Sequence, residues 1–110
     1  MAVIEFARNV LKIKSASSTE LNQKCTPVVG LIHEWKKDGK IIKGTNKDLG
    51  GTMRLGLYEA HLLNNSLIKN IYKSKSIKER HRHRYEVNIN YKNQFEKKGL
   101  IFSGNSPDKN

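Results

Sequence analysis

Arginine and histidine alternate along one short segment of the chain, Arg80-His81-Arg82-His83-Arg84. In an extended strand, side chains point alternately to two faces, so this order predicts the arginines on one face and the histidines, with Tyr85, on the other. Three guanidinium groups on one face repel each other unless anions or carboxylates lie opposite them. The segment therefore favours either an anionic ligand or an ion-pair network with neighbouring acids such as Glu79 and Glu86.

The two histidines of this segment, together with His33 or His61, are of a residue type that binds metal ions. No cysteine pair, His-Glu-x-x-His pattern or flanking acid cluster accompanies them. We therefore expect hydrogen-bonded imidazoles and no bound metal. The single cysteine, Cys25, lies in a polar stretch without a glycine-rich strand-to-helix turn around it, and we expect it to be incidental to catalysis.

Length and composition indicate one modest globular domain. The chain has 110 residues, of which 36% are hydrophobic and 28% are charged. No stretch approaches the about 18 consecutive apolar residues of a membrane span, and no basic region precedes an apolar run at the start. One cysteine offers no internal disulfide, as is usual in a reducing compartment. We expect a cytoplasmic protein without a membrane partner.

The formal net charge of +11 raises nucleic acid as a partner, because clustered cations gain affinity by releasing phosphate counterions. The lysines, however, are spread from Lys12 to Lys109, mostly singly or in pairs, among many Asn and Ile residues. A general compositional drift explains the charge better than a binding stripe, and nucleic acid is an unlikely partner. A small basic protein that binds RNA or another polyanion stays open as the alternative.

The apolar residues indicate alternating helices and strands. Spacings of three and four among Val3, Ile4, Ala7, Val10 and Leu11 predict an amphipathic helix over residues 1–12. The elements expected after it are a polar loop at 15–26, a buried strand at 27–32, a hairpin at 33–47 around Asp38-Gly39, extended chain at 50–63, a helix capped by Asn65 or Ser66 and running to Tyr72, extended chain at 77–88, a helix at 91–98 ending at Gly99, and a strand at 100–102. This order predicts an α/β fold with a mixed sheet.

Five blocks of the sequence resemble consecutive blocks of the CTP synthase family. They are residues 1–11, Ser18-Thr19-Glu20, Leu31-Ile32-His33-Glu34-Trp35, residues 48–56 with Gly-Gly-Thr-Met-Arg-Leu-Gly, and residues 79–88 with Glu-Arg-His-Arg-His-Arg-Tyr-Glu-Val-Asn. The resemblance runs along nearly the whole chain, and its last two blocks are far more specific than a degenerate short motif. It identifies residues 1–110 as part of the family's C-terminal class I glutamine amidotransferase domain.

The resemblance implies a flavodoxin-like fold, a mixed sheet flanked by helices, incomplete at both ends. In the family, the cysteine nucleophile lies on a turn just before the residue that aligns with Met1, and the histidine and glutamate of the triad follow the residue that aligns with Asn110. We therefore expect no catalytic residue in this chain. The chain alone would be inactive, although its parent enzyme is a glutamine-hydrolysing carbon-nitrogen ligase.

By the same resemblance, Glu20 binds the α-ammonium group of glutamine and Arg84 fixes the α-carboxylate end. Arg54 would contact the synthase domain or a guanine nucleotide effector. Each residue also has a purely structural alternative: a loop carboxylate or cap for Glu20, an ion-pair network for Arg84, and a tight turn for the segment around Arg54. Residue types alone leave these alternatives open.

The family's cofactors and partners follow from the resemblance as well. ATP and Mg²⁺ act in the synthase domain, where UTP is aminated to CTP, and GTP is the effector. The resemblance implies that the parent enzyme is a homotetramer and that the synthase domain is a partner of this segment. Glutamine would bind weakly or not at all to the chain by itself.

Overall fold

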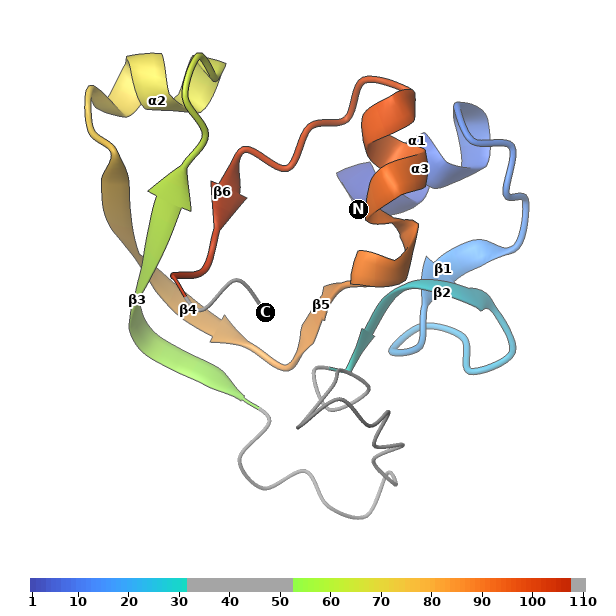
Figure 1. Cartoon of the computed structure of the whole chain (residues 1–110). Helices are drawn as coiled ribbons and strands as arrows, with labels where there is room; N and C mark the ends of the chain where they lie inside the picture. Colours follow the sequence, from blue (N-terminus) through green and yellow to red (C-terminus); the bar gives the residue numbers. More distant parts are fainter. Residues whose placement is uncertain (32–52, 108–110) are drawn as a thin grey trace. The chain divides into compact units, whose positions relative to one another are not determined.

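The computed structural model describes residues 1–31 and 53–107. The chain divides into two compact units (Figure 1). The first unit comprises Met1–Met53 and His83–Leu100, and the second comprises Arg54–Arg82 and Ile101–Asn110. The hairpin predicted around Asp38-Gly39 lies outside the described residues.

The first unit begins with the predicted amphipathic helix, α1 (Ala2–Asn9). Ile4 and Ala7 are buried on its inner face, and Glu5 and Arg8 are exposed. Glu5 lies in the first turn and Arg8 in the last turn, where each charge interacts favourably with the helix dipole. The amphipathic helix predicted over residues 1–12 is confirmed for residues 2–9.

A mixed three-stranded sheet lies beside α1. Its strands are β1 (Ala16–Ser18), β2 (Thr26–Leu31) and β5 (Tyr85–Val87), in the order β1-β2-β5. The outer strand β1 runs parallel to β2, and β5 runs antiparallel to it. Helix α1 packs against β1 and β2, and Val28 of the central strand is fully buried. The predictions of a mixed sheet and of a buried strand after residue 26 are confirmed.

The loop predicted at 15–26 is wrong for its first part, because residues 16–18 form β1. All three residues of this short strand are buried. The Nε of Arg8 donates a hydrogen bond to the carbonyl oxygen of Ala16 at 2.7 Å, and parallel pairing with β2 satisfies the neighbouring backbone groups. Two serines in a row give no strand signal by themselves, so this strand depends on contacts that are distant in sequence.

Helix α3 closes the first unit. After β5, the 3₁₀ turn η2 (Ile89–Tyr91) leads into α3 (Lys92–Lys97), which agrees with the predicted helix. The Phe95 side chain on α3 is fully buried, and its ring centroid lies 6.0 Å from that of Phe6 on α1. Gly99 has φ +96° just after the helix, a conformation in which glycine carries no steric penalty.

The second unit contains β3 (Arg54–Leu62), α2 (Leu67–Tyr72), β4 (Ser76–His83) up to Arg82, and β6 (Gly104–Asn105). The strand order is β4-β3-β6. Ser66 caps α2 through its side-chain oxygen, which accepts a hydrogen bond from the backbone N–H of Lys69 at 3.3 Å. The capped helix and the extended segments on either side of it were predicted, and they are confirmed. Among the described residues of this unit, Leu62 is the only buried apolar side chain, whereas Leu55, Leu57, Leu67 and Ile71 are exposed.

The strand predicted at 100–102 is wrong. The final strand, β6, begins at Gly104 and pairs antiparallel with the end of β3, His61 with Asn105 and Leu62 with Gly104. The backbone N–H of Leu63 also donates to the carbonyl oxygen of Ser103 at 2.8 Å. The apolar run at 100–102 suggested the strand, but the pairing register with β3 places it a few residues later.

We expect Gly99→Ala to lower the free energy of unfolding by about 1 kcal/mol, because alanine is strained at positive φ. The measurement is urea unfolding of the purified chain. Gly104→Ala is the matched control, since a Cβ there meets Leu62 only at an ordinary 3.7 Å and φ is not positive. Equal losses for the two variants would contradict the assignment of strain to Gly99.

Tyr72 gives a second prediction, which concerns pH. Its phenol donates a 2.5 Å hydrogen bond to the Glu79 carboxylate, and this bond, reinforced by the negative charge of Glu79, raises the pKa of Tyr72 above its ordinary value. The contact therefore stabilises the folded chain below the phenol's unfolded-state pKa and is lost as the pH rises through the folded-state pKa.

The substitution Glu79→Gln is expected to lower the pKa of Tyr72 toward its ordinary value. The pH titration of the assigned Tyr72 ring resonances measures this, and Glu59→Gln serves as the control because Glu59 faces His61. An unchanged Tyr72 titration in Glu79→Gln would show that the carboxylate is not the cause.

Candidate functional site

Glu20 lies in the tight turn that follows β1. Its backbone N–H donates to the Oγ of Ser18 at 3.2 Å, and the N–H groups of Leu21 and Asn22 both donate to the Ser18 carbonyl oxygen at 3.0 Å. Three hydrogen bonds to one residue thus fix the backbone of this turn. The Glu20 side chain is exposed, so its carboxylate is presented to solvent from a well-defined position.

Arg84 lies between two strands, because β4 ends at His83 and β5 begins at Tyr85. The backbone bends at Arg84, and the side chain is half-buried. The prediction that Arg80, Arg82 and Arg84 share one face of a continuous strand is therefore wrong for Arg84. Arg80 and Arg82 are exposed on β4.

The strand register places Glu20 and Arg84 at the same edge of the first unit's sheet. Ser18 pairs with Val29 across β1 and β2, and Leu31 pairs with Tyr85 across β2 and β5. The carboxyl ends of β1 and β2 therefore meet the amino end of β5, and Figure 1 shows the end of β2 beside the start of β5. Glu20 follows β1 at this edge and Arg84 precedes β5.

The spacing suits a zwitterion. Glu20 follows β1 and Arg84 precedes β5, and these strands are two positions apart in the sheet, which separates their backbones by about 10 Å. A free amino acid carries one ammonium and one carboxylate group, and each is recognised most strongly by a charged partner of opposite sign. An acid and an arginine facing one sheet edge can hold both groups of such a ligand.

Thr19 is a further polar residue at this edge. Its N–H donates to the carbonyl oxygen of Val29 at 3.2 Å and so extends the pairing of β1 with β2. Its Oγ1 is buried and forms no hydrogen bond with the described part of the chain. A buried hydroxyl in this situation costs free energy unless a ligand or another group satisfies it.

Asn88 joins β5 to β2 near Pro27, at the opposite end of this pairing from Glu20 and Arg84, a role that sequence reasoning missed. The buried side chain of Asn88 donates from Nδ2 to the Pro27 carbonyl oxygen at 2.8 Å. The backbone N–H of Asn88 donates to the Val28 carbonyl oxygen, also at 2.8 Å. Its Oδ1 accepts from the N–H of Asn90 at 3.0 Å and caps η2. The only available signal was an asparagine directly before a helical pattern, which is typical of a cap.

Arg54 lies in the second unit and is described separately. It is the first residue of β3, is exposed, and its guanidinium carbon lies 5.5 Å from the centroid of the Tyr58 ring. Such a contact is a cation–π interaction. The structure thus brings Glu20 and Arg84 to one edge and gives Arg54 a local aromatic partner.

The other candidates have local roles. The His81 ring meets the Tyr58 ring edge-on at 5.5 Å, and Nε2 of His61 lies 3.5 Å from the Glu59 carboxylate. Cys25 is half-buried in the turn before β2, and its N–H donates to the Asn22 carbonyl oxygen at 3.3 Å. Within residues 1–31 and 53–107, no group of three or more His, Cys, Asp or Glu residues could hold a metal ion.

Comparison with known proteins gives strong matches to one enzyme. The chain is 69% identical over 108 residues to a CTP synthase of Pelagibacter ubique, and 58% and 54% identical over 109 residues to those of Novosphingobium aromaticivorans and Rhodospirillum rubrum. Each match covers 98% of this chain. The chain is homologous to one segment of CTP synthase. It spans 20% of the length of these relatives, and no protein-family model matches it.

A solved structure shows the fold in which the homologous segment of CTP synthase occurs. The glutaminase domain of Trypanosoma brucei CTP synthase, solved with bound acivicin, superposes with a TM-score of 0.74 and 36% sequence identity. The match covers 94% of this chain and 36% of that domain. The predicted α/β fold, as part of a glutamine amidotransferase domain, is confirmed.

In the described part of the chain, no helix is long and apolar enough to cross a membrane.

We expect Asn88→Ala to lower the free energy of unfolding by about 2 kcal/mol, because it removes two buried side-chain hydrogen bonds, to the Pro27 carbonyl oxygen and from the Asn90 N–H. Urea unfolding measures the loss. Asn93→Ala on the exposed face of α3 is the matched control, and we expect it to stay within about 0.5 kcal/mol of the parent chain. A similar small effect for both variants would exclude Asn88 as the anchor of the β2–β5 pairing.

Proposed function

We propose that this chain forms the glutamine-recognising part of a CTP synthase glutaminase domain. The observation that carries the proposal is the shared sheet edge of Glu20 and Arg84, two residues of opposite charge separated by 64 positions of sequence. The homology to CTP synthase and the superposition on a glutaminase domain support it.

In this proposal, the Glu20 carboxylate accepts hydrogen bonds from the α-ammonium group of glutamine, and the Arg84 guanidinium donates to the α-carboxylate. Charge-assisted bonds of this kind are stronger than neutral ones and are directional. With both ends of the amino acid held, the side-chain amide points in one fixed direction. A substrate held in this way reacts as though in an intramolecular step.

The chemistry of the amide belongs to other segments of the parent domain. There, a cysteine thiolate attacks the side-chain amide, and the released ammonia is used to aminate UTP to CTP with ATP in the synthase domain. Arg54 is the residue of this chain that we place at a contact with the synthase domain or with a guanine nucleotide effector. We place the parent enzyme in the cytoplasm, as a homotetramer.

The test places this chain in a working enzyme. Its sequence replaces the 108-residue counterpart in the Pelagibacter ubique relative, with which it is 69% identical. We expect the graft to form CTP with glutamine or with free ammonia as the nitrogen source. In the graft, Glu20→Gln should lower kcat/KM for glutamine by about 10- to 100-fold, the value of one hydrogen bond to a charged group, and should leave ammonia-dependent CTP formation unchanged.

Glu5→Gln on α1 is the matched control, because Glu5 is another exposed acid of the same unit. It should leave both activities intact. The proposal fails if Glu20→Gln has no effect, or if it lowers the glutamine- and ammonia-dependent activities equally, since the second result indicates a folding defect. The isolated 110-residue chain should release no ammonia from glutamine above background.

A further inference from the structure

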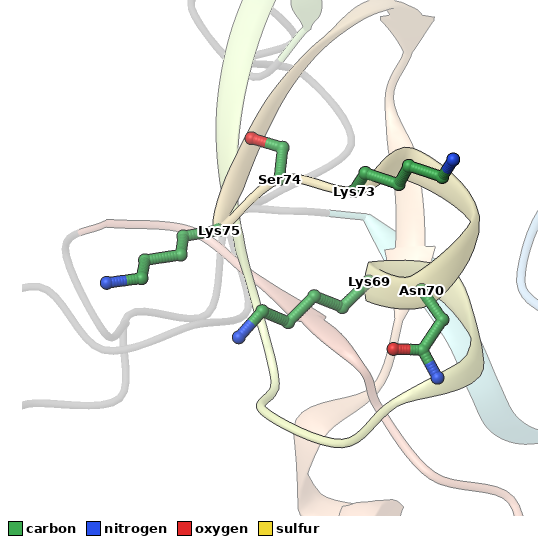
Figure 2. A pocket seen from close by; sticks show the side chains of 5 residues that line it. All are labelled: Lys69, Asn70, Lys73, Ser74 and Lys75. Atoms are coloured by element: carbon green, nitrogen blue, oxygen red, sulfur yellow. The ribbon is translucent and has the colours of Figure 1, made fainter.

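The second unit contains a lysine-lined pocket that the proposed function does not use. Figure 2 shows its lining, which consists of Lys69, Asn70, Lys73, Ser74 and Lys75. The pocket lies where α2 ends and the chain turns into β4, and its volume is about 400 Å³. Three of its five lining residues are lysines, and none is acidic.

Backbone hydrogen bonds fix the turn that carries these lysines. Helix α2 ends at Lys73, which has a left-handed conformation (φ 51°) and donates from its N–H to the Lys69 carbonyl oxygen at 2.8 Å. The Oγ of Ser74 then donates to the Ser76 carbonyl oxygen at 2.6 Å as β4 begins. The ammonium groups of Lys69 and Lys75 extend to the same side of the turn in Figure 2.

Within residues 54–82, no carboxylate forms a contact with this cluster that would balance its charge. Residues 54–82 contain two carboxylates, and both are engaged elsewhere: Glu79 accepts from the Tyr72 hydroxyl, and Glu59 lies 3.5 Å from His61. Lys69 donates to the Asn64 side-chain oxygen at 2.6 Å, which satisfies one proton and leaves the positive charge. The end of the helix dipole offsets only a fraction of one charge.

We propose that this lysine pocket binds a phosphate-bearing anion of several charges, a di- or triphosphate group. Lysine ammonium groups bind phosphate as point charges, and their mutual repulsion falls when a multivalent anion lies between them. Lys69 and Lys75 contact the anion, Lys73 raises the local positive potential, and the Asn70 amide supplies a neutral donor. This site lies in the second unit and is independent of Glu20 and Arg84.

The experiment is an NMR titration of the 110-residue chain with tripolyphosphate, repeated with ATP. Shift changes should be confined to the backbone amides of residues 69–75 and should saturate. The double substitution Lys69→Gln/Lys75→Gln should weaken tripolyphosphate binding about tenfold, because each exposed ion pair contributes up to about fivefold. Equal affinity for ATP would identify the phosphate chain as the ligand, and tighter ATP binding with further shifts would identify a nucleotide as its source.

Lys97→Gln/Lys98→Gln is the matched control. These exposed lysines end α3 as Lys69 and Lys73 end α2, and the net charge of the two double variants is the same. The control should bind within about twofold of the parent chain. The proposal is overturned if both variants lose affinity equally, or if the shifts spread over all basic residues. Either result would show diffuse attraction of the anion to the positively charged chain.

Two further checks keep the result decisive. The spectrum of the Lys69→Gln/Lys75→Gln variant reports whether it is folded, and the single substitution Lys75→Gln, outside the helix, provides the same test with less risk to α2. Saturable binding of a single-stranded RNA oligonucleotide, with no binding of tripolyphosphate or ATP, would overturn the proposal in favour of a nucleic-acid surface.

Discussion

The first unit depends on the pairing of β2 with a strand on each side. Val28 in the middle of β2 is fully buried, and β2 pairs with β1 in parallel and with β5 in antiparallel orientation. Asn88 locks the second pairing, since its side chain and backbone donate to successive carbonyl oxygens of β2. This pairing also positions the candidate ligand-binding residues, because Glu20 follows the outer strand β1 and Arg84 precedes the outer strand β5.

Local signals in the sequence were sufficient for the elements whose own residues determine them. The apolar spacing of α1, the apolar run of β2, the serine cap of α2 and Gly99 after α3 are each short-range features, and each was predicted. Strand β1 was missed because its Ala-Ser-Ser sequence has no strand signal and is buried only through Arg8 and β2. The final strand was misplaced because its position is set by pairing with β3.

The alternating Arg-His segment shows how one motif divides between two roles. The period of two held along β4, where His81 packs on Tyr58 and the arginines on either side of it are exposed. It failed at Arg84, where the backbone bends before β5. The family resemblance named Arg84 as a candidate site residue, whereas the strand argument placed its side chain with the wrong neighbours. A single bend separates an exposed basic strand from a half-buried arginine at a sheet edge.

In the proposed function, the recognition of glutamine and the chemistry on its amide belong to separate segments. Glu20 and Arg84 reach a common edge through the β1-β2-β5 pairing alone, and every residue that fixes that pairing in the described structure, Arg8, Ser18 and Asn88 included, lies in the same unit. A carboxylate on a hydrogen-bonded turn and an arginine at a strand junction need no nucleophile to be held in place. For the proposed amino-acid site, the preorganisation that gives selectivity would therefore be a property of this segment's sheet, and the reacting groups would only have to be brought to it.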